Sequence, residues 1–205
     1  MASANDEILD LMTTRALDLQ RLAAGQSRDV VRFLNDLEGD IVAQLARIDP
    51  TGIGSISRRA ARLSKLLEQV RATITGSFRA EGVRLAGELR EIADMEAKFA
   101  AAAINQGAGV QLITTELTRG QLTAITGNLL VQGSPVSELL SRQAGDVLQR
   151  FTDNMRLGIA QGETNGELIR RIRGGKQNGA VVEGFMKISR AHAETLVRSA
   201  TQAVS

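Results

Sequence analysis

The chain has 205 residues, enough for one or two domains with a sizeable core. It is 43% hydrophobic but only 2% aromatic, so Ala, Leu, Ile and Val must supply most of the buried surface. The absence of cysteine excludes disulfide scaffolds and thiolate metal sites, and a formal net charge of +2 is too small to mark a nucleic-acid-binding protein by itself.

Charge is distributed unevenly along the chain. Residues 1–50 hold five arginines against nine acidic residues, whereas residues 151–205 hold eight basic residues against five acidic ones. Solvated helix faces are the simplest explanation of both biases. No run approaches the ~20 apolar residues of a membrane helix, and the N-terminus lacks the basic start and apolar block of a secretory signal. We therefore expect no membrane contact.

Helical periodicity dominates the first half of the chain. A first helix is expected from Ser3 or Asn5, with a break or bend near Gly25 to Ser27. The next helical segment carries six apolar residues at steps of three and four, which places them on one face: Val30, Leu34, Leu37, Ile41, Leu45 and Ile48. It should end at Asp49, because the residue before a proline is pushed out of the α region.

The longest helical pattern begins near Ser57 and continues to about Ile104. Unbroken, it predicts a helix of roughly 48 residues and ~70 Å. Three glycines, at 76, 82 and 87, each weaken this helix by ~1 kcal/mol relative to Ala, or permit a bend or a close helix contact. So long a helix should pack along residues 30–48 as an extended antiparallel hairpin, or against a partner chain. The hairpin within one chain is the simpler arrangement.

Residues 107–133 are expected to form a junction. Gly107 and Gly109 should end the long helix, and the Thr- and Gly-rich segment that follows is compatible with a short helix, irregular chain or a short β-segment. The predicted organisation is therefore an N-terminal helical hairpin over residues 1–106, the junction, and a small helical domain over residues 134–205. The fold class is all-α.

The predicted C-terminal domain starts with a strong helix-start signal. Ser134 is a good N-cap and Pro135 suits the first helical position. Apolar residues then recur at helical spacing as far as Ile159, and Gly162 should end this helix in a left-handed conformation.

A short basic helix should follow. Thr164 and Glu167 match a capping box, in which each side chain satisfies the other residue's backbone donor. Gly174 should end the helix, and the segment that follows is expected to be a loop that could contain a short strand. Residues 187–205 return to helical spacing.

Motifs of enzyme chemistry are missing from the sequence. Gly174-Gly175-Lys176 does not form a phosphate loop, because Gln177 stands where Ser or Thr must bind magnesium. His192 is the only histidine and lies between Arg190 and Glu194, a neighbourhood typical of an exposed helix face. Three acids cluster where they favour the dipole of a helix N-terminus: Asp6, Glu7 and Asp10. The sequence therefore predicts no catalytic residue, cofactor or metal.

The best candidate for a contact site is a basic cluster around residue 173. Guanidinium groups suit phosphate or carboxylate partners. Alternatively, these cations only complement the dipole at the end of a helix. No aromatic residue is interleaved for base stacking, so duplex phosphates or an acidic protein surface are the partners to consider. The cluster comprises Arg170, Arg171, Arg173 and Lys176.

The last third of the chain combines a helix that ends at a glycine, a short helix capped by Thr, a loop, and an Ala-rich final helix that carries Arg198. In this pattern, from about Leu139 to Ser205, the chain resembles the head-morphogenesis domain of tailed phages, the minor head protein family typified by the Mu F protein. Ala200 stands where the family usually has Glu, so any role of that acid is not carried over. The residues on the motif are Gly162, Thr164, Glu167, Arg190, Arg198 and Ser199.

The resemblance implies a structural virion protein that is not an enzyme in its core domain. It would be made in the host cytoplasm and reside at the head or portal region of the virion, in several copies that are few relative to the major capsid protein. The implied partners are portal or capsid proteins, with possible non-specific contact to packaged double-stranded DNA. Family members continue beyond this signature, so we expect that the sequence is truncated at its C-terminal end.

Two alternatives stay open from the sequence. An internal virion protein that is ejected with DNA could share this domain. A non-viral coiled-coil adaptor or signalling rod would suit the Ala- and Ser/Thr-rich terminal helix, although the glycines at 107–133 and 174–184 interrupt a continuous repeat.

Overall fold

The computed structural model describes residues 4–48, 54–111, 117–131, 133–177 and 180–204. These residues divide into two compact units. Unit 1 comprises the described parts of Met1–Arg28, Gly82–Val136 and Thr195–Ser205, and unit 2 comprises those of Asp29–Glu81 and Ser137–Glu194.

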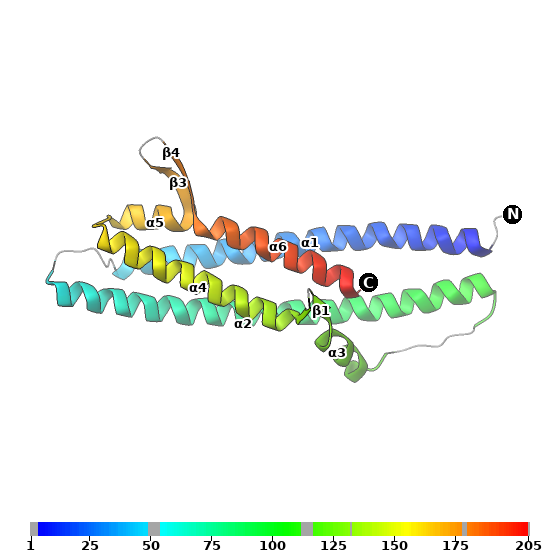
Figure 1. Ribbon diagram of the computed structural model, residues 1–205. Helices are drawn as coiled ribbons and strands as arrows, with labels where there is room; N and C mark the ends of the chain where they lie inside the picture. The colour runs from blue at the N-terminus through cyan, green and yellow to red at the C-terminus, as the bar shows by residue number, and fades with distance from the viewer. Residues whose placement is uncertain (1–3, 49–53, 112–116, 132, 178–179, 205) are drawn as a thin grey trace. The chain divides into compact units, whose positions relative to one another are not determined.

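The described chain is almost entirely helical (Figure 1). The helices are α1 (Ala4–Ile48), α2 (Ile56–Ala108), α3 (Arg119–Gly127), α4 (Val136–Ala160), α5 (Asn165–Arg173) and α6 (Phe185–Val204). Two small antiparallel strand pairs accompany them: β1 (Leu130–Val131) with β2 (Ser134–Pro135), and β3 (Gly174–Gln177) with β4 (Ala180–Glu183). The predicted all-α class is confirmed.

Helices α1 and α2 run antiparallel within each unit. In unit 2 the rings of Phe33 and Phe78 meet edge to face with centroids 5.2 Å apart, and Gln44 Nε2 donates to Thr73 Oγ1 at 2.6 Å. In unit 1 the Arg15 guanidinium pairs with the Glu96 carboxylate. Later residues of α1 thus pair with earlier residues of α2, and the predicted helical hairpin is confirmed.

The interior of unit 2 is apolar and draws on five helices. Leu34 of α1 and Ile74 of α2 are fully buried, as are Phe151 of α4, Ile172 of α5 and Met186 of α6. Fully burying side chains of this size contributes about 1.5–3 kcal/mol each. Unit 2 therefore holds a continuous hydrophobic core that fixes α4 and α5 against the hairpin.

The α1–α2 contact in unit 1 is more polar. Gln26 Nε2 lies 3.5 Å from Glu88 Oε2, and the Arg15 guanidinium pairs with the Glu96 carboxylate. Among the described α1 residues of unit 1, Ala23 is the only hydrophobic residue that is buried. The hydrophobic side chains of α1 are therefore less buried in unit 1 than in unit 2.

The sequence predicted a break or bend near Gly25 to Ser27, and the break is wrong, because α1 continues from Ala4 to Ile48. Tertiary contacts explain the continuity. Gln26 and Ser27 are 6% and 3% exposed, and their side chains bond to α6: Thr201 donates to Gln26, and Arg198 Nε donates to Ser27 Oγ at 3.3 Å. These contacts outweigh the ~1 kcal/mol that one helical glycine costs.

Helix α2 also continues through its glycines. A Cβ atom added at Gly76 or Gly87 would meet nothing within 4 Å. Neither position is therefore a site of close helix packing, and the helix extends to Ala108, with Gly109 in the left-handed region at φ 64°.

The described part of residues 107–133 contains a short helix and a short strand, α3 and β1, both of which the sequence left open. Helix α3 begins at a capping box in which Thr118 and Gln121 satisfy each other's backbone donors. Ser134 and Pro135 pair with β1 instead of starting a helix, so α4 begins one residue later than predicted, at Val136.

Each unit combines part of the α1–α2 hairpin with later segments of the chain. Residues 137–194 cluster with residues 29–81 of the hairpin, and residues 82–136 cluster with the N-terminal part of α1.

Candidate contact site

The turn between α4 and α5 has the geometry that the sequence predicted. Gly162 adopts φ 74°, and Thr164 caps α5 with an extended backbone. Glu167 Oε2 accepts from the Thr164 backbone N–H at 2.7 Å, while Thr164 Oγ1 accepts from the Glu167 N–H at 3.4 Å. The backbone N–H of Thr164, and secondly its hydroxyl, hold the pKa of Glu167 below its ordinary value.

Arg171 is held within this turn. Its Nε and Nη2 atoms donate to the two carboxylate oxygens of Glu163 at 2.6 Å each, and Nη2 also donates to Gln161 Oε1 at 2.7 Å. The hydrogen bonds that Arg171 donates to Glu163 raise the pKa of Arg171. A bidentate pair of this kind fixes orientation as well as charge, so Arg171 closes the α4–α5 turn.

Arg173 and Arg190 share the carboxylate of Glu38. The Glu38 side chain is only 12% exposed, and Arg173 Nε lies 3.2 Å from its Oε1 atom. Arg190 donates to the other carboxylate oxygen and, through Nε, to Asn35 Oδ1 at 2.7 Å. Within unit 2, Glu38 of α1 thereby joins the end of α5 to the start of α6. Arg190 is therefore paired within unit 2, two residues before the exposed His192.

Arg170 lies against the base of the β3–β4 hairpin. A Cβ atom added at Gly175 would come within 3.6 Å of the Arg170 Cγ atom, so the aliphatic part of the side chain covers this glycine. The guanidinium lies 3.8 Å from Glu167, and the Arg170 Nε atom is buried without a hydrogen-bond partner.

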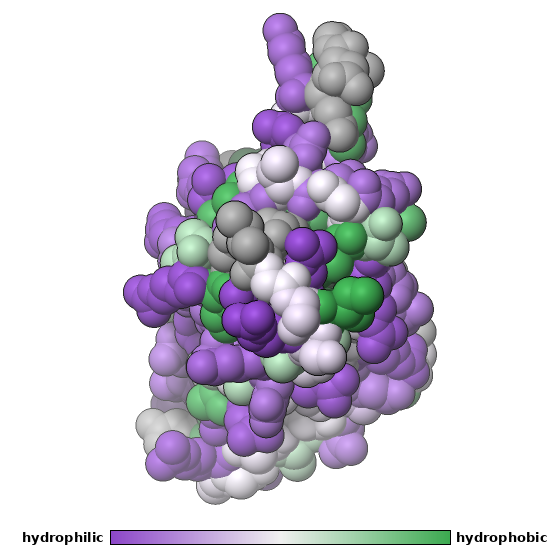
Figure 2. Space-filling model, turned by 90° about the vertical axis from the view of Figure 1, so that its left-hand side faces the viewer, coloured by the Kyte–Doolittle hydropathy of each residue, from purple (hydrophilic) through white to green (hydrophobic). Residues whose placement is uncertain are grey.

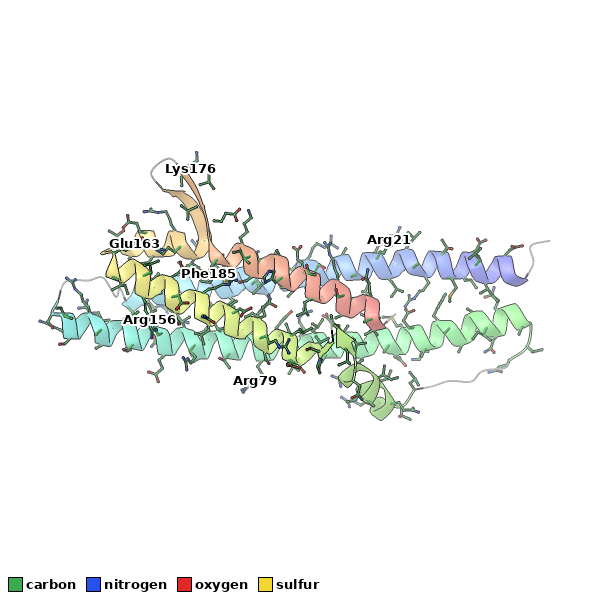
Figure 3. The ribbon with its side chains drawn as sticks, in the orientation of Figure 1. Arg21, Arg79, Arg156, Glu163, Lys176 and Phe185 are labelled. Atoms are coloured by element: carbon green, nitrogen blue, oxygen red, sulfur yellow. The ribbon has the colours of Figure 1, made fainter. Side chains whose placement is uncertain are left out.

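Lys176 is arranged differently from the three arginines. It lies on β3, its side chain is exposed, and it has no ion-pair partner among the residues that the structure describes. Figure 3 shows Lys176 on the hairpin, away from Glu163 in the α4–α5 turn and from Phe185 at the start of α6. Its cross-strand neighbour Val181 is 75% exposed.

The hairpin itself projects from unit 2. In Figure 2 it stands at the top of the view and carries both hydrophilic and hydrophobic atoms. Its base is tight, because Gly174 and Gly184 approach one another closely enough that a Cβ on Gly174 would lie 2.8 Å from the Gly184 nitrogen. This tight base and the exposed side chains of Lys176 and Val181 suit a contact element.

The remaining family-motif residues lie at the end of α6, in unit 1. Arg198 is exposed and bonds to Ser27, and Ser199 is half-buried. His192, on the unit 2 part of α6, is exposed as expected.

Within the described residues, no group of three or more His, Asp or Glu side chains is placed to hold a metal ion. No described helix is both long enough and apolar enough to cross a membrane.

The sequence did not reveal which acidic residues pair with the arginines. Glu163 pairs with Arg171, and Glu38 pairs with Arg173 and Arg190, yet each acid looks in the sequence like an ordinary surface residue. Glu163, eight residues before Arg171, falls in a turn and gave no periodic signal. Glu38 lies more than a hundred residues from Arg173 and Arg190, so only the fold brings them together.

Comparisons with known proteins gave no relative. No family model matches the chain, and no curated protein or solved structure matches it either.

Proposed function

We propose that this chain is a structural minor head protein of a tailed phage, which acts by protein–protein contact at the portal or inner capsid during head assembly. The observation that carries the proposal is the order of elements after residue 135. The family pattern that the sequence resembles has the same order of elements. Here α4 is followed by the left-handed Gly162, α5 is capped by Thr164, the β3–β4 hairpin comes next, and α6 carries Arg198.

The structure changes which residue of the basic cluster is the best candidate for that contact. Arg171 and Arg173 bind acids of the chain itself, and Arg170 covers the base of the hairpin. Lys176 remains exposed beside Val181. The proposed contact therefore pairs Lys176 with an acidic group of the portal or capsid and places Val181 against an apolar one.

The functional class is tested by the composition of purified particles. The protein should be present in virions and procapsids, at a copy number far below that of the major capsid protein, as measured by quantitative mass spectrometry. Its absence from both kinds of particle would refute the proposal. Loss from emptied heads, with presence in full ones, would instead identify a protein ejected with DNA.

The contact residue is tested by charge reversal. Lys176→Glu should reduce incorporation into particles while helix content by circular dichroism stays unchanged. Lys65→Glu is the matched control, because Lys65 is an exposed lysine on α2 of the same unit. Equal incorporation of both variants would show that the hairpin lysine makes no contact. Arg171→Glu is a poor probe, because it should lower stability by leaving Glu163 unpaired.

A coiled-coil adaptor is the second candidate, and the 45-residue α1 and 53-residue α2 favour it. An adaptor of non-viral origin would co-purify with a cellular complex and not with particles. The particle experiment therefore separates the two candidates.

A further inference from the structure

The first third of α2 concentrates positive charge. Between residues 54 and 80 the chain has six basic side chains and a single acid, Glu68, although the net charge of the whole chain is only +2. All of these residues belong to unit 2. The six basic residues are Arg58, Arg59, Arg62, Lys65, Arg71 and Arg79. The part of α2 in unit 2 is therefore strongly cationic.

Three of these cations form a line along the helix, the basic stripe: Arg58, Lys65 and Arg79. Their positions are seven and fourteen residues apart, which keeps the side chains near one face of α2. All three side chains are exposed, and Figure 3 shows Arg79 pointing away from the ribbon. At 1.5 Å of rise per residue, the stripe extends over about 32 Å.

The charge of the basic stripe is not neutralised within the described chain. Arg58 Nε donates to Ser55 Oγ at 3.4 Å, which is a neutral partner. No described carboxylate forms an ion pair with Arg58, Lys65 or Arg79. Arg62 lies nearby but is half-buried and interacts within the chain, so we assign it no external partner. The stripe thus presents three positive charges to solvent.

The helix dipole does not explain these cations. Positive side chains are favourable in the last turn of a helix and unfavourable in the first. The arginines of α5 lie in its last turn and follow this rule. Helix α2 begins at Ile56 with no acid in its first turn, and Arg58 lies in that turn. A local preference that exposed side chains violate indicates a requirement of function rather than of folding.

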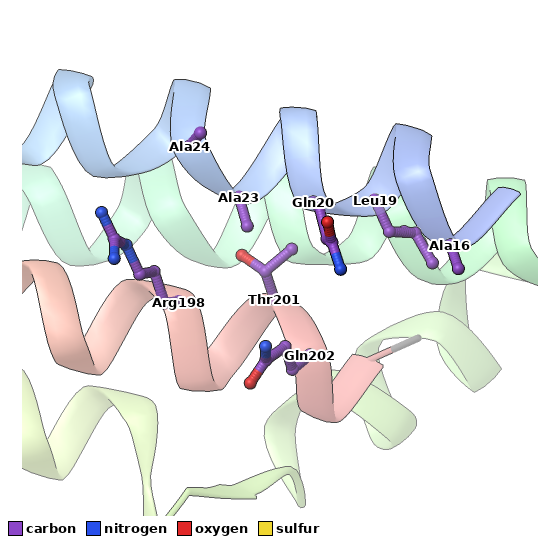
Figure 4. A pocket seen from close by; sticks show the side chains of 8 residues that line it. All are labelled: Ala16, Leu19, Gln20, Ala23, Ala24, Arg198, Thr201 and Gln202. Carbon is purple, nitrogen blue, oxygen red and sulfur yellow. The ribbon is translucent and has the colours of Figure 1, made fainter. Parts of the chain in front are cut away.

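An exposed cation elsewhere in the chain shows the contrast. Arg198, in unit 1, lies at a groove of about 470 Å³ between α1 and α6 (Figure 4). The other side chains that line this groove are uncharged. Arg198 therefore offers an extended anion a single charge, whereas the basic stripe offers three in a row.

We propose that the outer face of α2 in unit 2 binds the phosphate backbone of double-stranded DNA through Arg58, Lys65 and Arg79. The stripe carries no large apolar or aromatic side chain, which the centre of a protein–protein interface would use. Charge must therefore supply the affinity, and release of counterions from a nucleic-acid duplex provides this. Single-stranded bases would have no aromatic ring to stack on.

The geometry of the face fits B-form DNA. Its length of about 32 Å is close to one helical turn of the duplex, roughly 34 Å. The major groove of B-form DNA admits a helix, whereas that of duplex RNA is deep and narrow. Between Lys65 and Arg79 the face carries the small residues Ala72 and Gly76, and the space above Gly76 is open. The sugar–phosphate backbone can therefore come close to α2.

This surface goes beyond the proposed virion role and does not rest on it. The proposed protein contact is at Lys176 on the β3–β4 hairpin, whereas the DNA contact is on α2. Particle composition tests the virion role, and DNA binding by the purified chain tests the basic stripe. Failure of one conclusion is therefore distinguishable from failure of the other.

Fluorescence anisotropy of a labelled DNA duplex, titrated with the full chain, measures the binding. Three phosphate contacts at about 0.9 each predict a slope of about −2.7 for the logarithm of affinity against the logarithm of salt concentration. Affinity should fall roughly 40-fold between about 50 and 200 mM salt, with no preference for sequence. No binding at about 50 mM salt and about 100 µM protein would refute the proposal.

Neutralising the basic stripe should remove this binding. The triple variant Arg58→Gln, Lys65→Gln and Arg79→Gln should bind roughly tenfold more weakly or worse at low salt and lose most of the salt slope. Gln is a good helix former and the three sites are exposed, so circular dichroism should show unchanged helix content. Wild-type affinity in this variant would overturn the assignment.

A matched control separates the stripe from net charge. The triple variant Arg21→Gln, Arg32→Gln and Arg142→Gln removes the same charge from exposed arginines that pair with a neighbouring acid on their own helix. It should bind DNA nearly as tightly as the wild type. Equal weakening by both triple variants would refute the proposal, because net charge alone would then account for the binding.

Lysine acetylation read by mass spectrometry locates the DNA on the chain. The sequence contains four lysines, at positions 65, 98, 176 and 187. A saturating DNA duplex should slow acetylation of Lys65 and leave the other three unchanged. Protection of Lys176 in place of Lys65 would move the contact to the hairpin and overturn the proposal.

Two other polyanions test the class of partner. An RNA duplex of the same sequence and a polyglutamate peptide of the same charge should each bind more weakly than the DNA duplex at equal salt. Polyglutamate that binds as tightly as DNA would assign the face to an acidic protein and refute the proposal. Tighter binding of the RNA duplex would refute it as well.

Discussion

Gly184→Ala is the change that should damage unit 2 most for the smallest addition of atoms. Gly184 is buried between the end of β4 and the start of α6. An added Cβ would lie well under 3.0 Å from backbone atoms of Ile172, Arg173 and Gly174. Real Cβ atoms essentially never come this close to another atom. None of these atoms belongs to a side chain that can rotate away.

The expected loss follows from what would have to move. Overpacking a buried site typically costs 1–3 kcal/mol when side chains can adjust, so about 3 kcal/mol is expected where only backbone can yield. The strain cannot be relieved by opening the hairpin alone, because Ile172 and Phe185 on either side are buried in unit 2. For a chain of this size, about 3 kcal/mol corresponds to a fall in Tm of roughly 6–12 °C.

Thermal and urea unfolding followed by circular dichroism measure this loss. Gly166→Ala is the matched control, since Gly166 lies in the first turn of α5, where an added Cβ would meet only Thr164 Oγ1 at 4.0 Å. The control should be neutral or slightly stabilising. If Gly184→Ala melts within 1 °C of the wild type, the close approach of the two glycines is not a constraint of the fold.

Three further changes have defined outcomes. Gly76→Ala should stabilise by about 1 kcal/mol in urea titrations, because the position is helical and its surroundings are open. Thr164→Ala should cost about 1 kcal/mol, the usual cost of losing an N-cap side chain. It should also raise the pKa of Glu167, measured by NMR titration, because the Thr164 hydroxyl helps to lower that pKa. Since the folded pKa of Glu167 is lowered, the stability that depends on its charge is present above the ordinary pKa and is lost as pH falls through the lowered one. Arg190→Ala should lower stability by about 1.5 kcal/mol through the Glu38 contact, measured by urea unfolding.

Much of the secondary structure could be predicted, since its signals are local. The Thr164 and Glu167 capping box, the left-handed Gly162 and the buried face of residues 30–45 depend on residues within a few positions of one another. The missed cap at Thr118 had the same kind of signal, with Gln121 in place of the commoner Glu. Where prediction failed, at Gly25, a local weakness was outweighed by contacts with α6.

For the candidate site, the sequence predicted which residues are cationic but not what each of them contacts. Four cations close together in sequence suggested one basic surface, but the chain assigns them to different roles. Two pair with Glu163 and Glu38, one covers a glycine, and Lys176 stays exposed. Ion pairs between residues far apart in sequence leave no periodic trace, so the sequence could not distinguish these roles.

The sequence by itself determined that the chain is helical, that Thr164 and Glu167 cap α5 and which face of residues 30–45 is apolar, because backbone propensity and side-chain periodicity are local properties. Tertiary structure decided which cations are neutralised, that α1 and α2 continue through their glycines, and that α1 is covered at Leu34 but exposed at Met12. These outcomes depend on which distant segments supply the covering side chains and counter-charges, and no local pattern specifies them.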